Sequence, residues 1–343
     1  MTHIDFPALQ AIGFQQHFAA ALAAAPQEYF PARVTAVQRD WLTLDDGAHA
    51  YEARPGHQLA AAPVVGDWVL AERDGRGEVW IAQVLEPVNR LARRTMSGRQ
   101  ALASNVDTAL LVMGLDNDLN PRRMERYIAV VRACEVDPVM VLTKADIGAD
   151  AEDKAAQLRA RIPTGVPLLM LHPAEQNDDG VLAPWLRRGQ TLVLLGSSGV
   201  GKSTLTNALT GSVQATGGTR HGDDRGRHTT TARSLHRCPG GACIIDTPGL
   251  RAWQPDGDKD DIAASFDDIA ALAEGCQFRD CTHATEPGCA VRGVVDADRL
   301  RNYAKLLREA RRADATPLDR IAERARWKTL NKSARQRSRA KRS

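Results

Sequence analysis

One segment constrains the fold of this 343-residue chain more than any other. Residues 196–204 read Gly-Ser-Ser-Gly-Val-Gly-Lys-Ser-Thr, which matches the phosphate-loop pattern G-x-x-x-x-G-K-[ST]. The segment follows an apolar run at 191–195 and precedes a helix-forming run at 204–209. Glycines let the backbone wrap so that successive N–H groups face phosphate oxygens, and a helix N-terminus adds partial positive charge. The pattern predicts a nucleotide site at a strand end of an α/β sheet.

The residue types give each part of this loop an expected role. We expect Lys202 to reach the β- and γ-phosphates as a catalytic group, and the Ser203 hydroxyl to ligate Mg²⁺. The other loop residues that we expect to contact the nucleotide are Gly196, Ser197, Ser198, Gly199, Val200, Gly201 and Thr204. A D-x-x-G pattern, Asp246-Thr247-Pro248-Gly249, follows a second apolar run. We expect Asp246 to hold Mg²⁺ through water and the Gly249 N–H to contact the γ-phosphate.

A third element, Thr143-Lys144-Ala145-Asp146, resembles the [NT]-K-x-D guanine-specificity element of GTPases. The Asp146 carboxylate can accept hydrogen bonds from both N1–H and N2–H₂ of guanine, whereas adenine presents a lone pair at N1. An unpaired buried polar group costs about 1–3 kcal/mol, which favours GTP over ATP. The Lys144 stem can lie along the face of the base. A chance tetrapeptide at a strand end is the alternative.

Apolar runs alternate with helical patterns along residues 93–258, which predicts a parallel sheet covered on both faces. The expected strands are 108–113, 138–142, 167–171, 191–195 and 242–245, and the expected helices are 122–134 and 151–161. In ordinary GTPases the phosphate loop comes first, but here the guanine element precedes it. Strand ends define such sites whatever the chain order. The sequence therefore predicts a circularly permuted GTPase domain.

Residues 31–92 have the short, alternating pattern of a small barrel. Expected strands at 32–37, 41–44, 67–71 and 78–84, with an Asp-Asp-Gly turn, are four segments of a pattern that favours an OB-fold, a barrel of five short strands. Such a barrel can hold RNA on one face or be purely structural, and the pattern does not separate the two. Residues 1–30 are Ala-rich and are expected to form a peripheral helix or a loose extension.

The C-terminal part contains a metal-binding pattern between two helical stretches, 262–274 and 296–313. Cys276, Cys281, His283 and Cys289 place three thiols and one imidazole close together, which suits a closed, structural Zn²⁺ site. Free thiols with an incidental histidine are the alternative. We expect residues 259–320 to form a helical zinc domain.

Charge is concentrated at the end of the chain. Residues 301–343 hold 15 Lys and Arg against 4 Asp and Glu, although the whole chain carries only +3. Residues 321–343 are therefore expected to be a basic tail that contacts RNA, or alternatively a tail that aids solubility. No apolar stretch approaches the ~20 residues of a membrane span, and no secretory signal is evident. We expect a cytoplasmic protein without a membrane partner.

Together these features resemble the RsgA (YjeQ) family of small-ribosomal-subunit biogenesis GTPases. The resemblance covers roughly residues 31–320 and includes the barrel stretch 65–69, the nucleotide motifs, residues 226–231 and the zinc pattern. It implies an OB domain, a permuted GTPase domain and a zinc domain. It also implies an enzyme that hydrolyses GTP to GDP and phosphate when bound to the maturing small subunit and its rRNA. We expect a monomer.

The group that activates water is less evident. Ras-like enzymes place Gln after the D-x-x-G glycine, but Leu250 stands there and cannot orient water. His228, within Gly-Arg-His-Thr-Thr-Thr, is the best candidate for a catalytic residue, and contact with RNA is its alternative role. Thr230 is the expected further Mg²⁺ ligand, and Arg227 could neutralise developing charge.

Two other functions remain open at this point. The chain could be a nucleotide-gated RNA-binding module in which hydrolysis is incidental. It could also be a P-loop kinase that acts on a small molecule, although the guanine element argues against ATP.

Overall fold

The computed structural model describes residues 4–39, 41–95, 98–116, 118–146, 150–171, 178–211, 233–246 and 259–314. Its chain forms two compact units, residues 1–254 and 255–343.

The first unit contains a small closed barrel over residues 30–84, which confirms the architecture expected for this region. Its strands are β1 (Phe30–Val37), β2 (Leu42–Asp45), β3 (Ala50–Pro55), β4 (Trp68–Arg73) and β5 (Val79–Val84). The hydrogen-bonded order is β1-β2-β3-β5-β4, and β4 pairs back onto β1. Alternate residues point inward, as the two-residue period of a strand requires. The barrel core consists of Phe30, Ala32, Val34, Leu42, Leu44, Ala53, Val69, Ala71, Val79 and Ile81.

The N-terminal segment is helical and packs firmly against the barrel. It contains α1 (Phe6–Ala11), a 3₁₀ turn at Gln16–Phe18 and α2 (Ala19–Ala23). Asp5 caps α1 by accepting a hydrogen bond from the Ala8 N–H. The Phe14 ring meets the buried Trp68 ring edge-on at 4.9 Å. This segment is therefore part of the core of the first unit.

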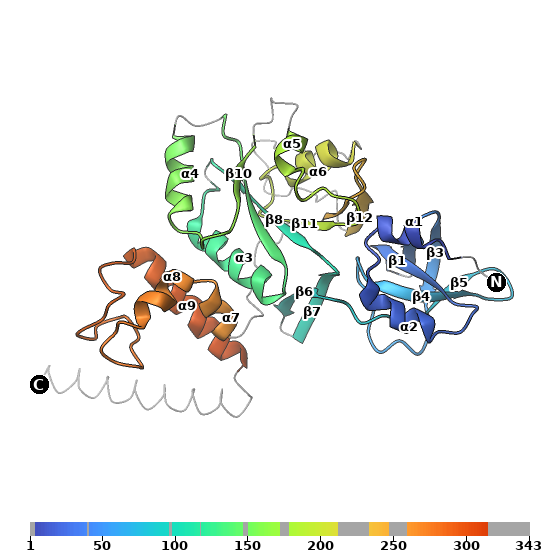
Figure 1. Cartoon of the computed structure of the whole chain (residues 1–343), viewed down its shortest axis with the longest axis horizontal. Coiled ribbons are helices and arrows are strands. Elements are labelled where there is room, and N and C mark those ends of the chain that lie inside the picture. Colours follow the sequence, from blue (N-terminus) through green and yellow to red (C-terminus); the bar gives the residue numbers. More distant parts are fainter. Residues whose placement is uncertain are drawn as a thin grey trace, which may run out of the picture. The chain divides into compact units, whose positions relative to one another are not determined.

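The nucleotide-motif region forms a twisted sheet with helices on both sides (Figure 1). A hairpin of β6 (Arg90–Thr95) and β7 (Gly98–Ser104) leads into it. The elements that follow are β8 (Thr108–Gly114), α3 (Pro121–Ala133), β9 (Asp137–Thr143), α4 (Ala151–Arg159), β10 (Leu168–Met170), α5 (Asp178–Leu182), β11 (Thr191–Leu195), α6 (Lys202–Thr210), β12 (Ser234–Arg237) and β13 (Cys243–Asp246).

The strand order of this sheet is β10-β9-β8-β11-β13-β12. The first five strands are parallel, and β12 is antiparallel to β13. The strand that carries the phosphate loop, β11, is central, and the strand that precedes the guanine element, β9, lies two places away. The sheet is thus assembled from strands in permuted chain order, as expected.

Alternate residues of the central strands enter two separate cores. Ala109, Leu111 and Met113 belong to the core shared with α3 and α4, whereas Leu110 and Val112 belong to the core shared with α5 and α6. This explains why β8 is continuously apolar: both of its faces are covered. Figure 1 shows the two helix pairs on either side of the sheet.

A buried arginine joins the barrel to the sheet. Arg33 of β1 is fully buried and donates to the Thr191 hydroxyl at 2.8 Å and to the Asn105 carbonyl at 3.0 Å. It also donates to the Ile12 carbonyl, and its guanidinium lies 5.7 Å from the centre of the Trp68 ring. The barrel and the sheet therefore pack as one unit.

The second unit is helical. It contains α7 (Lys259–Ala264), α8 (Asp267–Ala273) and α9 (Ala297–Asp314), around a core of Ile262, Phe266, Ile269, Val291, Leu306 and Ala310. The helix expected over 262–274 is divided at Phe266, whose backbone (φ −127°, ψ 50°) leaves the helical region. Arg299 pairs with Asp268 at 2.7 Å and lies over the Phe266 ring. Among the described residues, no helix combines the length and apolar character needed to cross a bilayer.

Candidate nucleotide site and metal centre

The phosphate loop connects β11 to α6 and depends on its glycines. A Cβ on Gly196 would lie 2.4 Å from the Val112 carbonyl oxygen, so only glycine allows this approach to β8. Gly199 and Gly201 have φ of +82° and +97°, a region that side chains disfavour. The loop therefore has a compact, wrapped backbone at the carboxyl edge of the sheet.

Lys202 begins α6, and its ammonium group lies inside this loop. Nζ donates to the carbonyl oxygens of Gly196 at 2.9 Å and Ser197 at 2.7 Å, and the residue is 8% exposed. Burial lowers the pKa of Lys202, and the carboxylates of Asp246 and Asp118 partly offset this effect. Ser203 is half-buried and Thr204 exposed on the same first turn of α6.

Thr143 joins the guanine element to the phosphate loop. Its Oγ1 donates to the Val200 carbonyl at 2.8 Å and lies 3.3 Å from the Met113 carbonyl. The residue is 8% exposed, so water does not compete strongly for these groups. The structure thus brings together two motifs that are 57 residues apart in the chain.

The rest of the guanine element continues this edge of the sheet. Lys144 has φ of +60°, and its Nζ lies 2.6 Å from Asp116 Oδ2. Ala145 is buried, whereas Asp146 is exposed. Partial burial raises the pKa of Asp116, but hydrogen bonds from Lys144 and from the Asp118 N–H bring it below its ordinary value. The Lys144 stem is therefore held in one direction by an ionised carboxylate.

Asp246 ends β13 directly beside the phosphate loop strand. It stands opposite Leu194 in the parallel pairing and is 4% exposed. Burial raises the pKa of Asp246, and Lys202 and His236 partly offset that rise. Ser203 and Asp246 are hard oxygen donors, the type that Mg²⁺ prefers, so both fit the expected magnesium role. Gly249, His228, Thr230, Arg227, Leu250 and the tail 321–343 lie outside the described residues.

The sequence patterns did not point to two acidic residues at this edge, Asp116 and Asp118. The Ser197 hydroxyl contacts both oxygens of Asp118, at 2.8 Å and 2.7 Å, and Arg123 pairs with the same carboxylate at 2.7 Å. Asp116 forms an ion pair with Lys144 and so orients its side chain. The available signal was their position just after β8, because the carboxyl ends of parallel strands meet at one edge.

The second unit brings its four predicted zinc ligands together. The ligand atoms of Cys276, Cys281, His283 and Cys289 all lie within 4.8 Å of one another. His283 Nδ1 lies 3.6 Å from the Cys276 sulfur and 3.5 Å from the Cys289 sulfur. Tetrahedral zinc with ordinary bond lengths would separate such N and S ligands by about 3.6 Å. The cluster thus has the spacing and donor types of a structural zinc site.

The backbone around this cluster is built for a tight turn. Gly288 has φ of +68°, and its carbonyl accepts a hydrogen bond from the Gln277 N–H at 3.0 Å. His283 also has a positive φ, +59°. The Arg292 N–H donates to the Cys289 sulfur at 3.3 Å, which favours the thiolate form. Four protein ligands leave no position for catalytic water.

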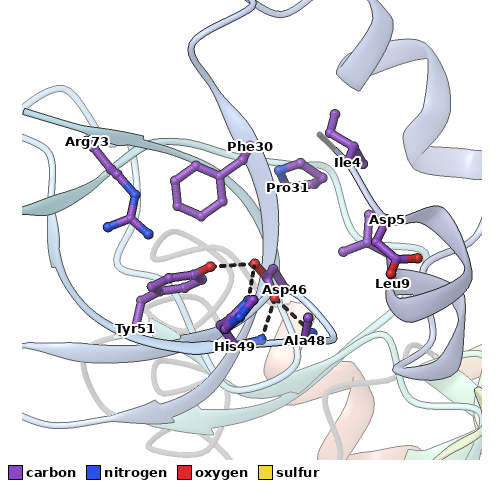
Figure 2. Close-up of a pocket in the computed structure, with 10 residues that line it drawn as sticks. All are labelled: Ile4, Asp5, Leu9, Phe30, Pro31, Asp46, Ala48, His49, Tyr51 and Arg73. Atoms are coloured by element: carbon purple, nitrogen blue, oxygen red, sulfur yellow. Dashed lines mark hydrogen bonds and ion pairs between the residues drawn. The ribbon is translucent and has the colours of Figure 1, made fainter. Parts of the chain in front are cut away.

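A separate cavity of about 280 Å³ lies on the barrel (Figure 2). Strands β1, β3 and β4, the turn after β2 and the N-terminal segment line it, through Ile4, Asp5, Leu9, Phe30, Pro31, Asp46, Ala48, His49, Tyr51 and Arg73. Its polar groups are mostly engaged: Asp46 accepts from Tyr51, Ala48 and His49. None of its lining residues belongs to the nucleotide motifs.

The chain is similar to known proteins over nearly its whole length. The model of the RsgA GTPase family matches residues 84–256. The small ribosomal subunit biogenesis GTPase RsgA of Xanthomonas oryzae pv. oryzae (strain PXO99A) is 42% identical, with 96% of this chain and 95% of that protein covered. The protein of the same name from Opitutus terrae is also 42% identical, with 96% and 98% covered.

Two solved structures share the fold. YloQ, described as a circularly permuted GTPase, has a TM-score of 0.60 at 23% identity, covering 84% of this chain and 98% of its own. YjeQ from Thermotoga maritima has a TM-score of 0.63 at 22% identity, covering 82% and 98%. The permuted sheet order, the joined nucleotide motifs and the sequence identity lead to one conclusion: the chain belongs to the RsgA GTPase family.

Proposed function

We propose that this protein binds GTP at the carboxyl edge of the permuted sheet and hydrolyses it to GDP and phosphate, stimulated by the small ribosomal subunit during late maturation. The observation that carries the proposal is the hydrogen bond from Thr143 Oγ1 to the Val200 carbonyl. It joins a guanine-type element to a phosphate loop, as a single bound nucleotide requires. The names of the relatives support the ribosomal role.

Base selection belongs to the guanine element. The exposed Asp146 carboxylate accepts from N1–H and N2–H₂ of guanine, and the Lys144 stem covers the face of the base. Asp116 holds Lys144 in place for this contact. Ala145 is buried and fixes the element to the core.

Phosphate binding belongs to residues 196–204. The loop N–H groups and the start of α6 face the phosphate oxygens, and Lys202 exchanges its two carbonyl partners for the β- and γ-phosphates. Ser203, Asp246 and Thr230 would hold Mg²⁺, Asp246 through water. When bound, Mg²⁺ neutralises charge that develops on the phosphates. The Gly249 N–H contacts the γ-phosphate.

His228 orients the attacking water, since Leu250 cannot. Water adds to the γ-phosphorus while the bond to the β–γ bridging oxygen breaks; that oxygen leaves on GDP, and the proton that the water loses passes to the released phosphate. Lys202 stabilises the leaving group's charge. Because Leu250 supplies no group that orients water, intrinsic turnover is slow and the subunit accelerates it.

The remaining parts serve recognition. We propose that the Cys276–Cys289 cluster holds one structural Zn²⁺, and that the barrel and the basic tail contact rRNA. We propose that the protein works in the cytoplasm, and that it acts as a monomer.

The decisive experiment measures GTP hydrolysis with isolated small subunits, with large subunits and with neither. We expect acceleration by small subunits alone, and competition by GDP but not by ATP. Equal rates in all three arms would favour an RNA-binding module with incidental hydrolysis. Effective competition by ATP would favour a small-molecule kinase.

A variant pair tests the catalytic assignment. His228→Ala should abolish subunit-stimulated turnover while nucleotide binding stays within about twofold, a small change on the scale of 1.4 kcal/mol per tenfold. His221→Ala, in the same sequence segment, is the matched control and should keep stimulated turnover. Full stimulation of His228→Ala would exclude the catalytic role.

A further inference from the structure

A continuous row of paired residues runs from the barrel to the aspartate of the D-x-x-G motif. In β12, Ser234 pairs with Ala36 of barrel strand β1 on one side and with Asp246 of β13 on the other. Neighbouring strands are about 4.7–4.9 Å apart, so Asp246 lies only two strand spacings from the barrel. Strand β12 is therefore a physical bridge between the barrel and the nucleotide edge.

Arg237, the last residue of β12, contacts the barrel at the turn that follows β2. Arg237 Nε lies 3.0 Å from Asp45 Oδ2, and a second guanidinium nitrogen contacts Asp45 Oδ1. The third nitrogen donates to the Gly47 carbonyl at 2.9 Å. A bidentate contact between a guanidinium and a carboxylate fixes the orientation of the two side chains as well as their distance. Arg237 thus links β12 to the turn after β2 through three hydrogen bonds.

The turn that receives this arginine is itself closely packed and hydrogen-bonded. Gly47 has φ of +95°, and a Cβ there would lie 2.4 Å from the Ala8 backbone, so the turn is pressed against α1. Asp45 accepts from the Gly47 N–H at 2.8 Å. The other side of the turn lines the barrel cavity and is fixed by the bonds of Asp46 to Tyr51 and His49 (Figure 2). Arg237 therefore binds a turn that is held by α1 on one side and by the bonds of Asp46 on the other.

Two side chains of β12, Ser234 and His236, contact each other beside Asp246. Ser234 Oγ lies 2.7 Å from His236 Nε2, and side chains two apart share one face of a strand. Asp246 opposes Ser234, so it lies on that same face. The β12 strand spans only four residues and has a single paired position on β1. Leu235 of β12 packs in the core that also holds Trp68, and the Arg237 contact adds an oriented polar link between this strand and the barrel.

We propose that Arg237 is a positioning residue: its contact with Asp45 and Gly47 couples the barrel to β12 and thereby sets the carboxylate of Asp246. The inference rests on the proposed function, in which a small subunit engages the barrel and Asp246 serves Mg²⁺. Arg237 acts through β12 and touches no substrate.

The test compares Arg237→Gln and Asp45→Asn with the wild-type protein. At saturating Mg²⁺ and without subunits, kcat and the KM for GTP should stay within about twofold. With saturating small subunits, kcat should fall at least tenfold in both variants, and the double variant should fall no further. The charge-exchanged pair Asp45→Arg with Arg237→Asp should recover most of the stimulation, which separates coupling from loss of folding.

A second readout measures binding alone. The Mg²⁺ concentration that half-saturates binding of a fluorescent GTP analogue should rise severalfold in Arg237→Gln. The matched control is Arg159→Gln, which removes an arginine bonded to two backbone carbonyls at the opposite edge of the sheet and should change neither readout.

Wild-type stimulation and Mg²⁺ dependence in Arg237→Gln would overturn the proposal, as would equal losses in Arg159→Gln. If the wild-type protein itself is not stimulated by small subunits, the proposed function fails, and the Mg²⁺-dependent binding then decides the coupling by itself.

Discussion

At the scale of single residues, Thr143 has the clearest testable role. Thr143→Val keeps the side-chain shape but leaves the Val200 carbonyl without its donor. An unpaired buried acceptor costs about 1–3 kcal/mol, so we expect guanine nucleotide affinity to fall roughly 5- to 150-fold. A fluorescence titration with a GDP analogue measures this. Thr143→Ser retains the hydroxyl and should bind within about threefold of wild type; equal affinity in Thr143→Val would contradict the assignment.

Two glycines of the phosphate loop should respond differently to alanine. In Gly196→Ala the new methyl would meet the Val112 carbonyl at 2.4 Å, whereas Gly199 has no atom within 4 Å and only a positive φ. Backbone strain at Gly199 costs about 1–2 kcal/mol, but Gly196→Ala must displace the neighbouring strand. We expect Gly196→Ala to lose nucleotide binding more than tenfold relative to Gly199→Ala in the same titration. The reverse ranking would contradict the packing described here.

Residue patterns identified the motifs but not all of their neighbours. Lys202 and Asp246 could be placed near one another because both follow buried parallel strands. The contact of Ser197 with Asp118 could not, since it joins residues 79 positions apart and depends on β8 lying next to β11. The positions 212–232 and 247–258, which carry His228, Thr230 and Gly249, keep their roles as predictions.

At the scale of elements, the second unit should depend on its metal ligands. Its apolar core is small, and Cys276 and Cys289 pack against it. We expect Cys289→Ser to lose zinc and to expose α7–α9 to protease, while the first unit binds GDP within about twofold of wild type. Small domains of this kind commonly need a metal to fold. Zinc content and limited proteolysis of the full chain measure the two effects.

Cys134→Ser is the control for this prediction. Cys134 is half-buried and lies outside the cluster, so its variant should retain zinc. A Cys289→Ser protein with full zinc content and an intact protease pattern would rule out the structural site.

Elements buried on both faces were predictable, and charged edge elements were not. Strand β8 reads as an unbroken apolar run because helices cover both sides. The β6–β7 hairpin contains several arginines and gave no strand signal. Strand β12 reads Ser-Leu-His-Arg, which is short and mostly polar, so it gave no strand signal either; one of its partners, β1, lies far away in the chain.

At the scale of the whole first unit, Arg33 should decide whether the barrel and the sheet unfold together. Arg33→Met keeps an unbranched stem but leaves buried oxygens of Ile12, Asn105 and Thr191 without a donor. Several unpaired acceptors at about 1–3 kcal/mol each predict a loss of roughly 3 kcal/mol or more in the free energy of unfolding. Urea unfolding followed by tryptophan fluorescence measures this loss.

The exposed Arg76 provides the comparison, and Arg76→Met should change stability by less than about 0.5 kcal/mol. Equal midpoints for the Arg33 and Arg76 variants would show that the barrel and sheet do not rely on this arginine. Sequence patterns predicted a barrel and an α/β region as separate modules. They could not reveal this joint, because arginine is rarely buried and its partners come from three distant segments.

The permuted strand order also affects how the chain is made on a translating ribosome. Strands β8, β9 and β10 emerge before β11 and can pair as three parallel strands, yet the free edge of β8 stays unpaired until residues 191–195 appear. At roughly 5–20 residues per second this interval lasts seconds. An unpaired edge strand with apolar side chains can pair with the same strand of another nascent copy. Synthesis of this protein should therefore be more sensitive to chaperone supply than that of a GTPase with β11 first.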